Sequence, residues 1–313
     1  MKTNPVHGAL FGVAIGDALG VPAEFTSRKT LQLDPIKDFI GYKSHNQPPG
    51  TFSDDSSLTF CLAETLCIGF DLHDLANRFI NWREHAYWTA GGKVFDIGLI
   101  TAEAIGNLKY VPRPQLAGCY GVNSNGNGSL MRILPLLFYI KDFDIDKRYE
   151  AASDVSSITH GHLRSVISCF YYLEYALELL KGHDKQTAFV NTAKTVSDFL
   201  VIKSFEEKEI NLFAPLLNEN IATQHVDSIP SSGYVLSTLK AAMYCFLTTG
   251  NYADAVLMAV NLGDDTDTTA AVTGGLAGLY YGFESIPEKW VKEIKRTNDI
   301  KDLCNRLAKA KGL

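Results

Sequence analysis

The sequence of 313 residues predicts an all-α fold, and three observations lead to that prediction. Large apolar residues recur at intervals of three and four, as in Leu75, Phe79 and Trp82, which is the spacing of one buried helix face. No segment shows the strict alternation of apolar and polar residues that is typical of strands. Hydrophobic residues make up 46% of the chain and charged residues 20%, which indicates a globular protein rather than a disordered or collagen-like one.

A series of helices follows from this periodicity, separated by segments rich in Gly, Pro, Asn and Ser. The clearest irregular segments are residues 26–50 and 119–128, and the polar residues 203–230 either connect helices or form a flap. No internal repeat or interdomain linker is evident, so we expect residues 1–313 to form a single domain. The expected helices cover residues 5–20, 56–68, 72–88, 94–107, 128–140, 147–158, 162–181, 185–202, 232–249, 251–261, 268–282 and 286–310.

The first and the last but one of these helices carry a glycine at every fourth position. Each glycine inside a helix costs about 1 kcal/mol relative to alanine, so the repeat requires a compensating gain from packing. A four-residue repeat puts all the glycines on one helix face, where the missing side chains let another backbone approach closely. We therefore expect both helices to run through a crowded centre. The glycines are Gly8, Gly12, Gly16, Gly20, Gly274, Gly278 and Gly282.

Charge and composition argue against several classes of partner. Lys and Arg total 29 against 35 Asp and Glu, so the chain lacks the basic excess of nucleic-acid-binding proteins. Residues 130–140 are too short to span a membrane and Asp17 interrupts the apolar N-terminal stretch, so we expect no membrane segment and no secretory signal. The six cysteines form no C-x-x-C pair, which suits buried thiols in a reducing cytoplasm. We expect a cytoplasmic monomer.

Two acidic clusters each stand immediately before an expected helix. The first contains Asp54 and Asp55, and the second contains Asp264, Asp265 and Asp267. Either cluster alone is explained by helix capping, because Ser and Asp oxygens accept the free N–H groups of a first turn. Capping needs only one or two oxygens, so five carboxylates in two short turns favour bound cations instead. An all-oxygen set suits Mg²⁺ or Mn²⁺ rather than Zn²⁺, and two clusters that meet in space can hold two ions.

Six segments carry recognisable motifs, which are GALFGVAIGDALGVPAEF (8–25), GTFSDDSS (50–57), FDIG (95–98), GNGSLMRILPL (126–136), THGH (159–162) and NLGDDTDTTAAVTGGLAGLYYG (261–282). Their order and spacing resemble the ADP-ribosylglycohydrolase family, which includes the dinitrogenase reductase-activating glycohydrolases of bacteria. The resemblance covers about residues 5–283. It implies a compact, single-domain, orthogonal helix bundle with a central cleft that holds two Mg²⁺ or Mn²⁺ ions.

The resemblance also implies which residues bind the metals. The family's Thr-Asp-Asp motif falls on the first acidic cluster, where Ser53 replaces the usual threonine and keeps its hydroxyl ligand. The family's Asp-x-Asp-Thr motif falls on the second cluster. Asp264 stands there in place of the family's usual glycine and adds a negative charge. The implied metal ligands are Ser53, Asp54, Asp55, Asp265, Asp267 and Thr268.

Catalytic and substrate-binding residues follow from the same resemblance. Glu24 matches a family acid near the metals, and Asp96 matches the acid proposed as the catalytic base. The GNGS segment matches the loop that cradles the ADP-ribose diphosphate, and His160 matches a substrate-contacting position. Considered without the resemblance, Asp96 is explained by helix capping, GNGS by a plain turn and His160 by a buried or capping role. The implied substrate-binding residues are Gly126, Asn127, Gly128, Ser129 and His160.

The function implied by the resemblance is metal-dependent hydrolysis of the N-glycosidic bond between ADP-ribose and a protein side chain. Arginine is the expected side chain. The expected partner is an ADP-ribosylated protein or a small ADP-ribosyl conjugate. One alternative keeps the centre but cleaves O-linked ADP-ribose, on serine or in acetyl-ADP-ribose, or another ADP-ribosyl conjugate. A second alternative is a catalytically silent structural or binding protein on the same fold. Both acidic clusters, Asp96 and the GNGS segment argue against the second alternative, because a structural protein needs none of them.

Overall fold

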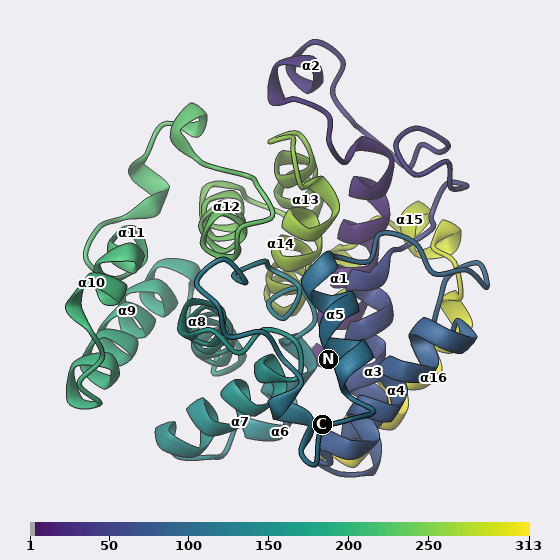
Figure 1. Ribbon diagram of the computed structural model, residues 1–313. Helices are drawn as coiled ribbons and strands as arrows, with labels where there is room; N and C mark the ends of the chain where they lie inside the picture. The colour runs from purple at the N-terminus through teal and green to yellow at the C-terminus, as the bar shows by residue number, and fades with distance from the viewer. Residues whose placement is uncertain (1–3) are drawn as a thin grey trace.

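The computed structural model describes residues 4–313, and these residues form helices and turns without a strand (Figure 1). The all-α prediction is therefore confirmed. The α-helices are α1 (Pro5–Gly20), α2 (Arg28–Leu33), α3 (Asp54–Ile68), α4 (Leu72–His85), α5 (Leu99–Asn107), α6 (Leu137–Ile140), α7 (Ile145–Ser157), α8 (Leu163–Leu180), α9 (Lys185–Ile202), α10 (Glu207–Ile210), α11 (Ala214–Leu217), α12 (Val235–Thr248), α13 (Tyr252–Val260), α14 (Thr266–Tyr281), α15 (Glu288–Glu293) and α16 (Thr297–Ala310). The 3-10 helices are Val21–Ala23, Pro114–Leu116, Leu134–Leu136, Asn211–Phe213, Ile221–Thr223, Val226–Ser228 and Phe283–Ser285.

The glycine faces of α1 and α14 pack directly against each other, so the expected crowded centre is confirmed and each helix is the close neighbour of the other. A Cβ atom added to Gly8 would lie 2.1 Å from the carbonyl oxygen of Gly278, and one added to Gly12 would lie 2.1 Å from that of Gly274. Side chains other than hydrogen are therefore impossible at this contact. Gly282 is the exception in the predicted set, because it lies just after α14 with φ 89° and ends that helix.

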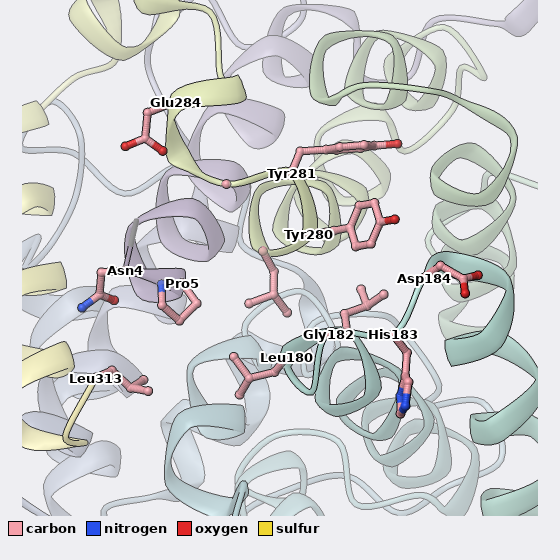
Figure 2. Close-up of a pocket in the computed structure, with 13 residues that line it drawn as sticks. Asn4, Pro5, Leu180, Gly182, His183, Asp184, Tyr280, Tyr281, Glu284 and Leu313 are labelled. Atoms are coloured by element: carbon pink, nitrogen blue, oxygen red, sulfur yellow. The ribbon is translucent and has the colours of Figure 1, made fainter. Parts of the chain in front are cut away.

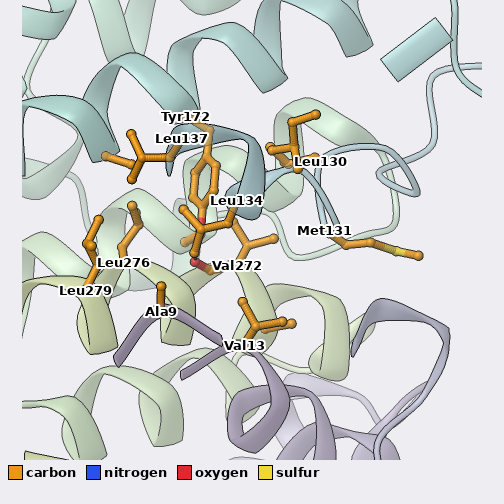
Figure 3. Packing of buried hydrophobic residues seen from close by; sticks show 14 of the residues in the cluster. Ala9, Val13, Leu130, Met131, Leu134, Leu137, Tyr172, Val272, Leu276 and Leu279 are labelled. Atoms are coloured by element: carbon orange, nitrogen blue, oxygen red, sulfur yellow. The ribbon is translucent and has the colours of Figure 1, made fainter. Parts of the chain in front are cut away.

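The core surrounds this central pair on all sides. Figure 3 shows Val13 of α1 and Val272 of α14 close to Leu134 and Tyr172, whose hydroxyl donates to the Val272 carbonyl oxygen (2.8 Å). One segment of the described chain, Pro5–Ala23, is long and apolar enough to cross a membrane by length and composition, and 94% of it is buried inside the protein. The apolar N-terminal stretch is thus the central core helix.

The expected helix over residues 128–140 is wrong. Residues 128–132 form successive turns, and helical structure resumes only in the 3-10 segment at 134–136 and in α6. Pro135 has no N–H group to donate to a helical ladder. The carbonyl of Gly128, which would pair with the backbone N–H of Arg132 in a helix, accepts instead from the Arg132 guanidinium (2.6 Å). A side-chain contact has replaced the helix here.

The expected helix over residues 286–310 is two helices, α15 and α16. Arg296 lies between them with a left-handed backbone (φ 59°). The N–H of Lys295 donates to the carbonyl of Gly50 (2.9 Å), so the break is tied to the segment that leads into α3. The short helix α2 is a further departure, since residues 26–50 are expected to be irregular.

Candidate active site

Oxygen-rich side chains from distant parts of the chain converge at one end of the α1–α14 pair. The two helices run antiparallel, so the end of α1 meets the start of α14, and a Cβ on Gly20 would lie 2.3 Å from the Cα of Asp267. α3, which begins with the first acidic cluster, also packs on α1. The close glycine contact therefore brings both acidic clusters to the same place.

Asp17 belongs to this site although the sequence analysis assigned it no role. It is fully buried in α1, and its carboxylate accepts the N–H of Ser53 (2.9 Å) and both the N–H and the hydroxyl of Ser56 (3.0 and 2.5 Å). These bonds satisfy free N–H groups at the start of α3. Burial raises the pKa of Asp17 to about 6. The available signal was a single carboxylate inside an otherwise apolar helix.

Ser53 and Asp17, and not the two aspartates of the first cluster, cap α3. The hydroxyl of Ser53 accepts the N–H of Asp55 (3.3 Å) and donates to Oδ2 of Asp55 (3.0 Å). Asp54 borders the cleft, and burial together with the neighbouring Asp55 raises its pKa well above the ordinary value. Helix capping therefore does not account for Asp54 and Asp55.

The second acidic cluster touches the first at the start of α14. The hydroxyl of Thr268 donates to Oδ2 of Asp55 (3.4 Å), and the N–H of Thr268 donates to Oδ1 of Asp267 (2.8 Å). Asp265 forms no side-chain cap, and its Oδ2 accepts instead from the amide of Asn127 (2.8 Å). These bonds leave Oδ1 of Asp265 and Oδ2 of Asp267 without a partner among the described residues.

Three buried carboxylate oxygens in these clusters lack a hydrogen-bond partner among residues 4–313, namely Oδ1 of Asp55, Oδ1 of Asp265 and Oδ2 of Asp267. Carboxylate oxygens of Asp17, Asp55 and Asp267 lie within 4.8 Å of one another, and so do those of Glu24, Asp265 and Asp267. Burial and mutual repulsion raise the pKa of Asp55 and Asp267 well above the ordinary value. Unpaired buried carboxylates are the ligands of hard divalent cations, so these residues fit a metal site.

In excess chelator, the melting temperature is expected to fall between pH 7 and pH 8. The folded protein holds Asp96 with a pKa of about 7 and Glu24 with a pKa of about 8, against ordinary values of 3.8 and 4.5. In this window the unfolded chain has already released these protons, so the folded state binds more protons and stability falls as pH rises. Histidines of the unfolded chain have a pKa near 6.5, so they are largely neutral between pH 7 and pH 8 and contribute little to this change.

Added Mg²⁺ or Mn²⁺ is expected to raise the melting temperature, and to do so more at pH 8 than at pH 7, because the metal binds the deprotonated native site. Scanning calorimetry at both pH values, with chelator or with metal, measures both effects. If excess chelator and excess metal gave the same melting temperature at pH 8, the carboxylates would hold no cation.

Glu24 and Asp96 lie next to each other beside the clusters, and both approach Nε2 of His45. His45 Nε2 hydrogen-bonds Oε2 of Glu24 and lies 3.8 Å from Oδ1 of Asp96. Burial, assisted by Asp265, raises the pKa of Glu24, and burial, assisted by Glu24, raises that of Asp96. Carboxyl groups that titrate near neutral pH are suited to accept and return a proton. Asp96 also has a left-handed backbone (φ 57°), a conformation that is concentrated at functional sites.

The GNGS segment forms a turn that is tied to the second cluster. The N–H of Asn127 donates to the carbonyl of Gly233 (3.1 Å), while its side chain holds Asp265. A Cβ on Gly128 would lie 2.8 Å from both Cε1 of His160 and Oγ1 of Thr101, so glycine is required there. The turn is therefore held against the second acidic cluster by the bond from Asn127 to Asp265.

His160 and Ser129 adjoin this turn in different ways. His160 is buried, which lowers its pKa to about 3 and keeps the ring neutral. Its Nδ1 pairs with Oγ1 of Thr159 (2.8 Å), and its Nε2 lies beside Gly126. The hydroxyl of Ser129 accepts from Ser156 (2.9 Å) inside the core, so Ser129 offers only its backbone to the turn.

A cavity of about 560 Å³ joins these parts into one cleft. A larger cavity of about 830 Å³ lies at the other end of α14, next to Tyr280 and Tyr281, and contains none of the predicted site residues (Figure 2). The smaller cavity is therefore the candidate active site. Its lining includes Glu24, Asp54, Asp96, Gly126, Asn127, Gly128, His160, Asp265 and Thr268.

Asp264 belongs to the second acidic cluster in sequence but to neither group of converging carboxylates. Its side chain is exposed and its backbone is left-handed (φ 60°), which explains why glycine suits this position. Its N–H donates to the carbonyl of Thr26 (2.9 Å), and its carbonyl accepts the N–H of Phe25 (2.7 Å). These two backbone bonds hold residues 25 and 26, which follow Glu24, against this turn, and the aspartate at position 264 preserves them.

The central helix pair brings two carboxylate clusters and a glycine-rich turn to one cleft. Comparisons with known proteins identify the class to which this fold and site belong, which is that of helical hydrolases of ADP-ribosyl bonds. The model of the ADP-ribosylglycohydrolase family matches residues 2–313. The chain belongs to this family and is an enzyme of the ADP-ribosylglycohydrolase type.

Relatives with named activities match over almost the whole chain. The ADP-ribosylarginine hydrolase Tri1 of Serratia proteamaculans is 32% identical over 97% of this chain and 79% of its own length. The ADP-ribosyl-[dinitrogen reductase] glycohydrolase of Rhodospirillum rubrum is 24% identical over 98% of this chain and 96% of its own. A solved structure described as an ADP-ribosylglycohydrolase-related protein complex has a TM-score of 0.82 and 27% identity, and the match covers 98% of both chains.

Proposed function

We propose that this protein hydrolyses the N-glycosidic bond between ADP-ribose and an arginine side chain and releases free ADP-ribose. The observation that carries the proposal is the cleft itself, which is lined by Glu24, Asp96, Asp265 and residues 126–128. Unpaired carboxylate oxygens of Asp265 and of the neighbouring buried Asp267 lie at this cleft. Its acidic wall is complementary to a positively charged guanidinium leaving group. The similarity to an ADP-ribosylarginine hydrolase supports arginine as the side chain from which ADP-ribose is removed.

We further propose that the cofactors are two Mg²⁺ or Mn²⁺ ions. Two groups of carboxylates, which share Asp267, support two neighbouring sites. When bound, such ions orient ribose hydroxyls or a water molecule at the anomeric carbon. The proposed ligands are Asp17, Ser53, Asp54, Asp55, Asp265, Asp267 and Thr268, and Glu24 lies against the second group.

The residues of the chain divide the remaining work. The backbone of residues 126–129 and neutral His160 hold the diphosphate and ribose in the cleft. Asp96, or Glu24 beside it, accepts a proton from the attacking water as the water oxygen bonds to the anomeric carbon. The bond from that carbon to the guanidinium nitrogen breaks, and the proton returns to the leaving guanidine, which balances the reaction.

Six unpaired cysteine thiols support the further proposal that the enzyme works in the reducing cytoplasm. Burial raises the pKa of the thiols of Cys61, Cys245 and Cys304, so these three are inert to oxidation.

The decisive experiment compares ADP-ribose release from arginine-modified and serine-modified protein, each with Mg²⁺ and with chelator. We expect release from arginine to be faster by at least about 100-fold, because a site built for one polar leaving group rejects another strongly. Release should stop in chelator. Faster release from serine would assign the enzyme to O-linked ADP-ribose instead, and no release from either substrate would support a silent binding protein on this fold.

A further inference from the structure

Arg132 is a fully buried cation that takes no part in the proposed reaction and does not line the cleft. Its Nη1 donates to the carbonyl of Gly128 (2.6 Å) and its Nη2 to the carbonyl of Val155 (3.0 Å). The guanidinium carbon lies 4.9 Å from the centre of the Phe79 ring, and Nε has no hydrogen-bond partner within residues 4–313. This is an unusual environment for an arginine, because buried charges are normally paired.

No carboxylate forms an ion pair with Arg132 in the described part of the chain. Burial lowers its pKa to about 10, so the group remains charged at neutral pH. Its charge acts on both walls of the cleft, since it interacts electrostatically with Asp54 and helps to lower the pKa of His160. The positive charge is therefore held behind the cleft without a partner of its own.

The hydrogen bond to Gly128 also fixes the direction of a peptide group. In a trans peptide the C=O of Gly128 and the N–H of Ser129 point in opposite directions. Because the carbonyl points at Arg132, the Ser129 N–H points to the side opposite Arg132, next to Gly128, which lines the cleft. The turn closes through the N–H of Met131, which donates to the carbonyl of Asn127 (3.1 Å).

Three successive N–H groups of this turn have no acceptor among the described residues, namely those of Gly128, Ser129 and Leu130. All three residues are buried. Consecutive free N–H groups in a single helical turn form a concavity that binds anions, and unpaired buried donors are rare without a ligand. Arg132 thus stands behind an array of donors and holds that array in register.

We propose that Arg132 is a positioning residue for the substrate diphosphate, acting through the peptide of Gly128 and Ser129 and through a fixed positive charge behind the turn. This inference rests on the proposed function, which assigns the diphosphate to residues 126–129. Arg132 touches no substrate atom in this arrangement, so its effect is transmitted by the backbone and by the electric field.

Two substitutions separate the hydrogen bonds from the charge. Arg132→Met removes both, while Arg132→Lys keeps the charge but cannot bind two carbonyls in the same planar geometry. We expect Arg132→Met to weaken ADP-ribose binding about 10- to 100-fold, the range for loss of charge-assisted hydrogen bonds, and Arg132→Lys to weaken it less. Arg148→Lys is the control, because Arg148 is a partly buried arginine with two bonds to Glu174 away from the cleft.

Calorimetry with three probes, ADP-ribose, adenosine and Mg²⁺, distinguishes positioning from a loss of structure. Adenosine lacks the diphosphate, so its affinity should be unchanged in Arg132→Met. Removal of a positive charge near Asp54 should leave Mg²⁺ affinity unchanged or increase it, in contrast to the effect on ADP-ribose. This opposite response is not produced by a merely loosened fold.

Unchanged ADP-ribose affinity in Arg132→Met would overturn the proposal. Equal weakening of all three probes, with a lower melting temperature, would also overturn it and leave Arg132 a purely structural role. If Arg132→Met did not fold, Arg132→Lys would decide by the same three measurements. Wild-type protein that binds ADP-ribose without hydrolysing any conjugate would contradict the proposed function and leave this assignment standing.

Discussion

Replacing Asp55 or Asp267 by alanine is expected to abolish ADP-ribose release and to weaken Mg²⁺ or Mn²⁺ binding by at least about 100-fold, more than the loss of a residue that only supports a ligand. Both carboxylates belong to the group with Asp17 in which the oxygens lie within 4.8 Å. Each has an oxygen without a hydrogen-bond partner among the described residues, so its removal breaks few protein contacts. Metal titration by calorimetry and an assay of ADP-ribose release measure the two effects.

The melting temperature adds a second test of the same substitutions. In chelator, each variant should be at least as stable as the wild type near pH 8, because one buried carboxylate with a raised pKa has been removed from a repulsive cluster. Asp184→Ala is the control, since Asp184 accepts the N–H groups of Gln186 and Thr187 (both 3.0 Å) as an ordinary cap of α9.

The control variant should lose some stability, as expected for removal of a helix cap, and keep its metal affinity and activity. Wild-type metal affinity in both Asp55→Ala and Asp267→Ala would contradict the assignment of two metal sites. A loss of stability like that of Asp184→Ala, without any change in metal binding, would return both residues to a capping role.

The close packing of α1 and α14 could be predicted from sequence, but their pairing with each other could not, because a glycine repeat does not identify the neighbouring helix. Glycine at every fourth position weakens an isolated helix, and only backbone contact with a neighbour offsets this cost. The contacts of Gly12 with Gly274 and of Gly8 with Gly278 show that each of the two helices is that neighbour for the other. The same contact aligns the acidic helix starts, so the place of the site follows from the fold.

The turn at residues 128–132 could not be predicted in this way. Its apolar residues satisfy a helical period, and Pro135 alone does not forbid a helix that bends. The deciding interaction is the bond from Arg132 to the Gly128 carbonyl, which depends on a core built by other helices. A tertiary contact has overridden the local helical periodicity here. The resulting turn leaves the N–H groups of residues 128–130 without acceptors among the described residues.

Two members of the site were missed for different reasons. Asp17 gave a signal, since a buried carboxylate in an apolar helix requires partners, but those partners lie on α3 and no spacing rule connects the two segments. His45 gave none, because it lies in an irregular segment and meets Glu24 and Asp96 only through the folded chain. Sequence motifs identify ligands more readily than the groups that orient them.

Asp96→Asn is expected to reduce turnover about 10²- to 10⁴-fold, the usual cost of losing a positioned base, while ADP-ribose still binds with near-native affinity. Asparagine keeps the shape of the side chain and tolerates the left-handed backbone of residue 96 better than alanine does, so the local structure should persist. The substitution therefore removes the proton acceptor alone. Steady-state kinetics with ADP-ribosyl-arginine and calorimetry with ADP-ribose measure the two quantities separately.

Glu24→Gln is the matched comparison, because Glu24 lies beside the same histidine and also has a raised pKa. If Asp96 is the base, Asp96→Asn should lower kcat far more than KM, since a base acts in the transition state and not in the bound ground state. Near-native turnover of Asp96→Asn together with inactive Glu24→Gln would assign the base to Glu24. Lost ADP-ribose affinity with intact metal binding would mean that Asp96 holds the ligand, because only a group that contacts bound ADP-ribose lowers its affinity without lowering that of the metal.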